Sequence, residues 1–375
     1  MRIAILGLKG IPATYGGVER YTEELATRLA ARGHEILVYA RTHYTSKELA
    51  RKPYQGIQLV RLPSLNLKTT DTLSHTLLST LDVITQRHVD TVIYQSLGNA
   101  FMSVLPRLAG IPTILVLHTE EWRMEKWKGA TAQVFLRASE RVSFSLATHV
   151  CVTSQWLQEN LRLRYGREAG FASQGITLPE LRPMKNLETL GLTSRGYILF
   201  VGRLVPQKGV HLLLEAYSKL QTDMPLVIVG DAPHQKKYQD QLRSLATPGV
   251  RFLGFRYGDE LAELYSHAYV YVLPSSSEGI AFTLLEALAF NNCVLVSTIP
   301  ANIEAAGPSG FFFQSGDTSD LCRVLGELLA HPDLVAERRG QARAHIAQQY
   351  NWDRVADYYE QLCLALTTPD KGAHR

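Results

Sequence analysis

The sequence predicts an α/β protein with two doubly wound parallel sheets, one in each half of the chain. Three observations carry this prediction. A chain of 375 residues is too long for one ordinary core and suits two domains. Short apolar segments alternate with longer segments of helical periodicity from end to end. The interval 174–196 interrupts this alternation with three glycines, two prolines and no clear period, so it is expected to be a linker.

The short apolar segments of both halves fit the repeat of strands and helices that builds a parallel sheet covered on both faces. In the first half, the expected strands are 2–6, 35–39, 57–61, 91–94, 113–117 and 149–153. In the second half, they are 197–201, 226–229, 250–253, 269–273 and 294–297.

These two series predict two Rossmann-like domains. We expect an N-terminal domain over 1–176, a C-terminal domain over 177–350, and a last helix, about 351–375, that packs back on the first domain. Gly175 is expected near the hinge. Ligands of doubly wound sheets bind beyond the carboxyl ends of the strands, so two such sheets facing each other predict a site in a central cleft.

The composition excludes several other classes. With 46% hydrophobic and 20% charged residues, the chain is typical of globular proteins. The longest apolar runs end near five residues, whereas a membrane-spanning helix needs about 20. The apolar start is too short for a secretory signal, which predicts a cytoplasmic protein. Four scattered cysteines, with no C-x-x-C, are expected to be reduced core residues.

The charge is unevenly distributed along the chain. The formal net charge is +4, but residues 1–170 hold 21 Lys and Arg against 14 Asp and Glu, a net of +7. This surplus suits a phosphate-bearing partner or peripheral contact with the inner face of a membrane, while a solvated basic face is the open alternative. We expect no nucleic-acid partner.

The loop after the strand 197–201 combines Gly202, Arg203 and Lys208 just before a helix. A cation at a helix N-terminus opposes the helix dipole unless an anion binds there as well. The pattern therefore predicts a phosphate site, with an exposed Lys and a structural Arg as the alternative.

A second loop follows the strand 269–273 and leads into another helix. Gly279 and the small Ala281 would let backbone N–H groups approach an oxygen ligand closely. Inside the helix, Glu286 has apolar neighbours, and a buried carboxylate requires donors. Ribose hydroxyls would supply them; an Arg or backbone partner is the alternative.

In the first half, Gly16 and Gly17 precede a helix and could present bare amides to a ligand, or could form a plain turn. This loop is not G-x-G-x-x-G, and the strand 35–39 is followed by Ala40 instead of an acid, which argues against a nicotinamide dehydrogenase. His118 follows the strand 113–117 and would face the cleft, although an isolated histidine is often structural.

Taken together, the run Phe200 to Gly209, the pair Glu278 and Glu286 with seven residues between them, and Gly16-Gly17-Val18-Glu19 resemble the retaining glycosyltransferases of family 4, which have the GT-B fold. The resemblance covers nearly the whole chain. The opening from Lys9 to Gly17, with Tyr15, is also similar to a subgroup of bacterial polysaccharide enzymes that includes rhamnosyltransferases.

The resemblance implies roles for individual residues. It places the donor diphosphate on Arg203 and Lys208, the sugar on Glu278 and the amides that follow it, and the ribose on Glu286. It also implies that His118 reaches the donor sugar. The residues expected in catalysis are His118, Arg203, Lys208 and Glu278. Those expected to bind the donor are Gly16, Gly17, Gly202, Arg203, Lys208, Glu278, Gly279, Ile280, Ala281 and Glu286. The residues expected on the acceptor side are Tyr15, Glu120 and Trp122.

Trp122 would stack on a sugar or lie at a membrane interface, with ordinary packing as the alternative. Many relatives read E-G-F-G-x-P where this chain has Ile280 and Ala281, so the donor sugar cannot be carried over from them. No D-x-D motif occurs, so we expect neither a metal nor a cofactor, with cations and helix ends neutralising the departing diphosphate.

The expected function is therefore retaining, metal-independent transfer of a hexosyl group from a nucleotide diphosphate sugar to a hydroxyl of a saccharide or lipid-linked acceptor, in the synthesis of bacterial cell-surface polysaccharide or glycoconjugate. The retaining stereochemistry follows from the resemblance alone. Two alternatives stay open: a sugar-nucleotide epimerase of the same fold, and a non-catalytic nucleotide-binding protein.

Overall fold

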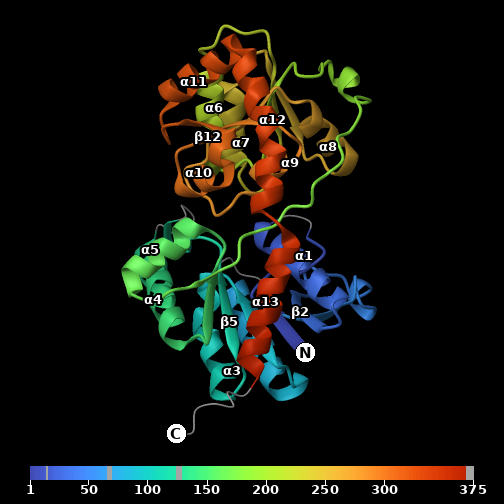
Figure 1. The fold of residues 1–375 in the computed structure, drawn as a ribbon, viewed down its shortest axis with the longest axis vertical. Helices are drawn as coiled ribbons and strands as arrows, with labels where there is room; N and C mark the ends of the chain where they lie inside the picture. Colours follow the sequence, from blue (N-terminus) through green and yellow to red (C-terminus); the bar gives the residue numbers. More distant parts are fainter. Residues whose placement is uncertain (14–15, 66–69, 124–128, 369–375) are drawn as a thin grey trace. The chain divides into compact units, whose positions relative to one another are not determined.

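The computed structural model describes residues 1–13, 16–65, 70–123 and 129–368, and the chain divides into two compact units. Unit 1 contains Met1–Gly175 and the returning segment Trp352–Arg375, and unit 2 contains Ile176–Asn351. The change of unit after Gly175 lies one residue from the boundary expected from the sequence. Each unit is built on its own parallel sheet covered by helices (Figure 1).

Unit 1 has a seven-stranded sheet in the order β3-β2-β1-β4-β5-β6-β7, in which every neighbouring pair is parallel. Its strands are β1 (Arg2–Leu6), β2 (Glu35–Arg41), β3 (Ile57–Leu62), β4 (Thr91–Gln95), β5 (Thr113–Leu117), β6 (His149–Val152) and β7 (Gly170–Phe171). Its α-helices are α1 (Gly17–Ala31), α2 (Asp71–Asp82), α3 (Val104–Leu108), α4 (Ala130–Leu146), α5 (Gln155–Tyr165) and α13 (Trp352–Thr367), and the 3-10 helix η3 (Leu97–Ser103) precedes α3.

Unit 2 has a six-stranded parallel sheet in the order β10-β9-β8-β11-β12-β13. Its strands are β8 (Ile198–Val201), β9 (Leu226–Val229), β10 (Val250–Gly254), β11 (Val270–Leu273), β12 (Cys293–Ser297) and β13 (Gly310–Phe313). Its helices are α6 (Val210–Tyr217), α7 (Lys236–Leu245), α8 (Gly258–His267), α9 (Phe282–Ala289), α10 (Pro300–Ala306), α11 (Thr318–Ala330) and α12 (Pro332–Gln349).

The predicted fold class is confirmed: both sheets are parallel and doubly wound. In each sheet the strand order reverses once, between β1 and β4 in unit 1 and between β8 and β11 in unit 2. Ligands of such sheets bind beyond the carboxyl ends of the strands at this switch point. The loops that follow β8 and β11 are therefore neighbours in unit 2, and those that follow β1 and β4 are neighbours in unit 1.

Two strands were not expected from the sequence. β7 has only two residues, which is too short to show a period, and β13 begins inside the turn-like sequence Gly-Pro-Ser-Gly. The interval 174–196 is also less of a linker than expected, because Leu187 and Leu192 are buried in the core of unit 2.

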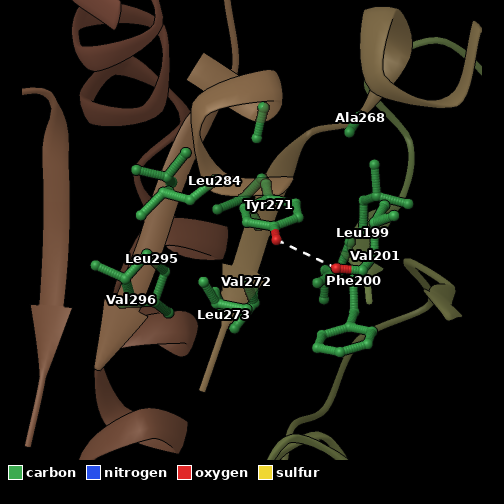
Figure 2. Close-up of a cluster of buried hydrophobic side chains, with 14 of the residues drawn as sticks. Leu199, Phe200, Val201, Ala268, Tyr271, Val272, Leu273, Leu284, Leu295 and Val296 are labelled. Carbon is green, nitrogen blue, oxygen red and sulfur yellow. Dashed lines mark hydrogen bonds between the residues drawn. The ribbon is translucent and has the colours of Figure 1, made fainter. Parts of the chain in front are cut away.

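The core of unit 2 surrounds the central strands, whose side chains are buried on both faces of the sheet. Figure 2 shows side chains of β8, β11, α9 and β12 together in this core. Tyr271 lies among them and its hydroxyl donates to the carbonyl of Val201 at 3.4 Å, which links β11 to the end of β8 (Figure 2). Among the helices that the structure describes, none is long and apolar enough to cross a membrane.

Candidate functional site

The loop between β8 and α6 is held by the close approach of Gly209 to the end of β11. Gly209 has φ +70°, and a Cβ at this position would lie 2.0 Å from the carbonyl oxygen of Pro274. Only glycine fits both the left-handed backbone and this contact. The approach places Lys208, one residue earlier, beside the loop that follows β11.

Lys208 and Glu278 form an ion pair, with Nζ 2.6 Å from Oε1. Both side chains are largely buried, at 12% and 10% exposure, so the pair is screened less by solvent than a surface pair would be. Two further bonds join the loops: the Ser276 N–H donates to the Gln207 carbonyl at 2.9 Å, and Gln207 Nε2 donates to the Ser277 carbonyl. The structure thus brings together two of the predicted residues from strands that are adjacent at the switch point.

Arg203 and Gly202 lie earlier on the same loop. Arg203 is exposed and forms no ion pair with a described residue. Gly202 lies close to Gly230, the glycine that follows β9: a Cβ on Gly230 would lie 1.9 Å from the Gly202 carbonyl oxygen. The guanidinium is thus accessible, while the backbone around it is fixed.

Glu286, on α9, is half-buried and accepts a hydrogen bond from the hydroxyl of Tyr265 at 3.2 Å. The sequence suggested an Arg or a backbone group as the alternative donor, so the phenol was not foreseen. Both carboxylates affect the phenol of Tyr271. Burial raises the pKa of this phenol, and the negative charges of Glu278 and Glu286 raise it further. The two acids therefore act on one region of unit 2.

Gly279, Ile280 and Ala281 lead into α9. The side chains of Ile280 and Ala281 are buried in the core of unit 2, so these residues can offer a ligand only their backbone. Ala281 is the N-cap of α9, and its carbonyl accepts from the N–H groups of Leu284 and Leu285.

In unit 1, Gly16 and Gly17 stand at the start of α1, which begins at Gly17. Both are exposed, and Gly16 has φ +115°. Two carboxylates of the helix hold the preceding loop: Glu19 accepts from the N–H of Lys9 at 3.1 Å, and Glu23 accepts from the N–H of Ala13 at 2.6 Å. Tyr15 lies outside the described residues.

His118 directly follows β5 and is partly buried. Its Nε2 lies 2.7 Å from Oε1 of Gln95, and its ring packs edge-on against Tyr21 with centroids 5.0 Å apart. Burial lowers the pKa of the imidazole to about 4, so the ring is neutral at physiological pH. Sequence reasoning missed Gln95, although a glutamine that ends an otherwise buried strand is an available signal.

Glu120 and Trp122 belong to an internal network instead of an open surface. Glu120 is 1% exposed and pairs with Arg164 at 2.5 Å, and Asn160 also donates to it. The Trp122 indole donates to Glu140 at 2.9 Å, and its ring lies beneath the guanidinium of Arg164. For Trp122, these contacts correspond to the ordinary packing that the sequence left open. In the part of the chain that the structure describes, no three His, Cys, Asp or Glu side chains are grouped to hold a metal ion.

Known proteins resemble the chain along almost its full length. It is 25% identical to a glycogen synthase of Mycobacterium tuberculosis, covering 97% of this chain and 95% of that protein. It is 24% identical to a GDP-mannose-dependent monoacylated alpha-(1-6)-phosphatidylinositol monomannoside mannosyltransferase of Corynebacterium glutamicum, covering 92% and 93% of the two chains.

Solved structures share the fold. A sucrose-phosphate synthase from Thermosynechococcus elongatus superimposes with a TM-score of 0.83 at 20% identity, over 97% of this chain and 98% of that one. The Anabaena protein HepE, solved with UDP-glucose, superimposes with a TM-score of 0.79 at 18% identity, over 97% and 100% of the two chains.

Two family models match the chain, one in each unit. The model described as Glycosyltransferase Family 4 matches residues 15–170, and the model described as glycosyl transferases group 1 matches residues 185–349. With named glycosyltransferases similar over its length and the same fold in solved structures, the chain belongs to the family 4 type of glycosyltransferases and has the GT-B fold.

Proposed function

We propose that this glycosyltransferase moves a hexosyl group, with retention and without a metal or other cofactor, from a nucleotide diphosphate sugar to a hydroxyl of a saccharide or lipid-linked acceptor. The observation that carries the proposal is the Lys208–Glu278 ion pair at the switch point of unit 2. A cation and a carboxylate in contact, largely buried, offer one group for a phosphate and one for sugar hydroxyls.

The chemistry assigned to unit 2 follows from these groups. Lys208 and the exposed Arg203 would neutralise the departing diphosphate, and Glu286 would accept from ribose hydroxyls. Hydrogen bonds to charged groups contribute about 1.5–3 kcal/mol each, so two cations could supply a useful part of the lowering of the barrier. The acceptor hydroxyl would enter on the face that the diphosphate leaves and pass its proton to the leaving oxygen, which retains the configuration.

Two similar proteins support the donor class. HepE was solved with UDP-glucose, and the C. glutamicum enzyme is described as GDP-mannose-dependent. We extend nucleotide-sugar binding to this chain and leave the base and the sugar to experiment. The similarity to a subgroup of bacterial polysaccharide enzymes supports a role in the synthesis of cell-surface polysaccharide or glycoconjugate.

Thermal shift with UDP, GDP, ADP and dTDP tests donor binding first, because a ligand that binds only the native state raises the melting temperature. We expect one nucleotide to raise the melting temperature of the protein. The sugar conjugate of that nucleotide should support glycosyl transfer in the presence of EDTA. NMR of the product should show the same anomeric configuration as in the donor. The proposal fails if no nucleotide stabilises the protein. Activity that EDTA abolishes and Mg²⁺ restores would refute metal independence, and an inverted product would refute retention.

Incubation with the nucleotide sugar alone separates the two other functions. A sugar-nucleotide epimerase would accumulate an epimer without acceptor, whereas a glycosyltransferase gives only slow hydrolysis. A non-catalytic nucleotide-binding protein would bind the nucleotide sugar and give neither an epimer nor a hydrolysis product.

Peripheral contact with an anionic membrane is part of the proposal and is supported by one face of unit 1. The basic apolar face is defined by five exposed apolar side chains of η3, α3 and α4 and by three exposed arginines of α3 and α4: Phe101, Leu105, Leu108, Val134, Phe135, Arg107, Arg137 and Arg141. Phe101 of η3 contacts Phe135 of α4, with ring centroids 5.6 Å apart. The one carboxylate within η3, α3 and α4, Glu140, is buried, so this face is positively charged.

Flotation with vesicles containing anionic phosphatidylglycerol tests this contact. We expect salt-sensitive binding that Leu108→Asp and Phe135→Asp weaken and that Leu334→Asp, an exposed leucine on α12, leaves unchanged. Equal flotation of all variants, or none of the unsubstituted protein, would remove the membrane from the proposal.

A further inference from the structure

Gln95 ends β4, the strand that pairs with β1 on one side and β5 on the other. Its side chain is fully buried. Asn99 fixes the backbone around it by donating to the Gln95 carbonyl at 2.6 Å and to the Gly7 carbonyl at 3.4 Å. Gly7 must be glycine here, since it has φ +91° and a Cβ would lie 2.5 Å from the Gln95 carbonyl oxygen. Gln95 therefore has a fixed place at the carboxyl edge of three central strands.

The side chain of Gln95 reaches the imidazole of His118 across that edge. Oε1 lies 2.7 Å from Nε2, a normal hydrogen-bond distance. An uncharged amide orients an imidazole without adding the negative charge by which a carboxylate partner would favour protonation. Among the described residues, the phenol of Tyr21 packs edge-on against the ring, and burial raises its pKa, so it is also uncharged.

Keeping a glutamine at this position costs stability. Its Nε2 is buried and has no hydrogen-bond partner among the described residues, and a buried polar group without a partner loses its hydration uncompensated. The next residue, Ser96, has φ +72°, a region that residues other than glycine seldom adopt. An apolar side chain would avoid the first cost, so the amide is best explained by its bond to the histidine.

We propose that Gln95 is a positioning residue: its Oε1 accepts the Nε2–H of His118, which holds the ring in one tautomer and leaves Nδ1 as an acceptor for a hydroxyl of the donor sugar. The Nδ1 atom has no hydrogen-bond partner in the described part of the chain. The inference rests on the proposed function for the part that concerns the sugar, and on unit 1 alone for the tautomer.

NMR of the free protein labelled with ¹⁵N-histidine tests the tautomer without any donor. The signal of His118 among the 12 histidines is identified by its loss in the His118→Asn variant. We expect the chemical shifts of a neutral ring protonated at Nε2. A ring protonated at Nδ1, or an equal mixture of the tautomers, overturns the proposal. Since no nucleotide is present, this result stands whether or not the protein transfers a sugar.

The isosteric variant Gln95→Glu tests the contact directly. A carboxylate against Nε2 favours the imidazolium, so the pKa of His118 should rise from about 4 by at least one unit, while Gln58→Glu, on an exposed position of β3, should leave it unchanged. The transfer rate of Gln95→Glu should then fall as pH is lowered through the raised pKa. An unchanged His118 titration in the folded variant contradicts the proposal.

A double-mutant cycle tests whether Gln95 acts through His118. We expect Gln95→Met to lower kcat about tenfold with little change in the KM of the donor, and to have no further effect in a His118→Ala background. If the loss of kcat in the double variant equals the product of the losses in the two single variants, Gln95 has a general structural role and the inference is rejected. If Gln95→Met does not fold, the NMR of the unsubstituted protein and of Gln95→Glu decides.

Discussion

Lys208 and Glu278 neutralise each other in their ion pair, so under the proposed function a nucleotide sugar would replace this bond by new ones. A phosphate would take over Lys208, and a sugar hydroxyl would donate to Glu278. The ion pair keeps two charged side chains in place and partly buried until then, which an isolated buried charge could not do without a large desolvation cost. Substitutions of Lys208 and of Glu278 should therefore have different effects on the affinity for the nucleotide alone and on the binding of the sugar.

Glu278→Gln should tighten binding of the matching nucleoside diphosphate by about tenfold, because it frees Lys208 and removes a negative charge beside the phosphate. The same variant should lower transfer, since the sugar loses a charged acceptor. Lys208→Met should weaken nucleotide binding by about tenfold or more.

Titration calorimetry measures these affinities, with Lys219→Met, an exposed position of unit 2, as the control. Equal affinity in all four proteins would mean that the ion pair lies away from the diphosphate.

At the scale of elements, the sequence predicts the loops of unit 2 well and those of unit 1 less completely. The glycines, cations and acids after β8 and β11 form short motifs, and the parallel sheet dictates that the two loops meet. In the sequence, nothing distinguished Glu120 and Trp122 from residues that bind a ligand. Their partners in the structure, Arg164 and Glu140, are distant from them in the chain. Local patterns cannot distinguish a buried ion-pair network from a surface that binds a ligand.

The turn between β8 and α6 gives a prediction at this scale. Gly209→Ala should lower both stability and nucleotide affinity, because the new Cβ would lie 2.0 Å from the Pro274 carbonyl oxygen and force Lys208 away from Glu278. Gly316→Ala is the matched control: it has φ +83° but no atom within 4 Å of the new Cβ. It should cost about 1 kcal/mol of backbone strain and leave nucleotide affinity unchanged.

Thermal melts and titration calorimetry of the two glycine variants make this comparison. Equal losses of stability and affinity would show that the left-handed backbone, and not the contact with Pro274, decides the effect.

Across the whole molecule, the four tryptophans all belong to unit 1, so their fluorescence follows the unfolding of that unit alone. Two histidines of unit 1, His75 and His118, have pKa values lowered to about 4, chiefly by burial. In the unfolded chain both would titrate near 6.5. Between these values the unfolded state binds more protons, so the free energy of unfolding should fall as pH is lowered from about 7 to 4.

Urea unfolding followed by tryptophan fluorescence at pH 7, 6 and 5 should show this as a falling midpoint. The His118→Gln variant should reduce the dependence on pH, since it removes one of the histidines whose pKa is lowered by burial. A midpoint that stays constant down to pH 5 in the unsubstituted protein would contradict the assignment of neutral buried histidines.

The chain leaves unit 1 after Gly175 and returns to it at Trp352, where α13 packs beside α1 (Figure 1). Tyr359 of α13 is fully buried, and Tyr21 donates to its hydroxyl at 3.2 Å. Arg32, the residue that caps the C-terminus of α1, forms ion pairs with Asp357 and Glu360 of α13. The last helix is therefore part of the first core, although all of unit 2 separates the two in sequence.

Tyr359→Ala should destabilise unit 1 by about 3–5 kcal/mol, the usual cost of deleting a buried aromatic ring, whereas Leu364→Ala, on the exposed side of α13, should cost less than about 1 kcal/mol. Tryptophan fluorescence in urea measures the change in unit 1, and nucleotide binding reports whether unit 2 stays folded. Because the partners of Tyr359 named by its hydrogen bond and ring contacts, Tyr21 and Tyr358, belong to unit 1, nucleotide affinity should persist at urea concentrations where the tryptophan signal of the variant is already lost. Simultaneous loss of both signals would mean that the two units unfold as one.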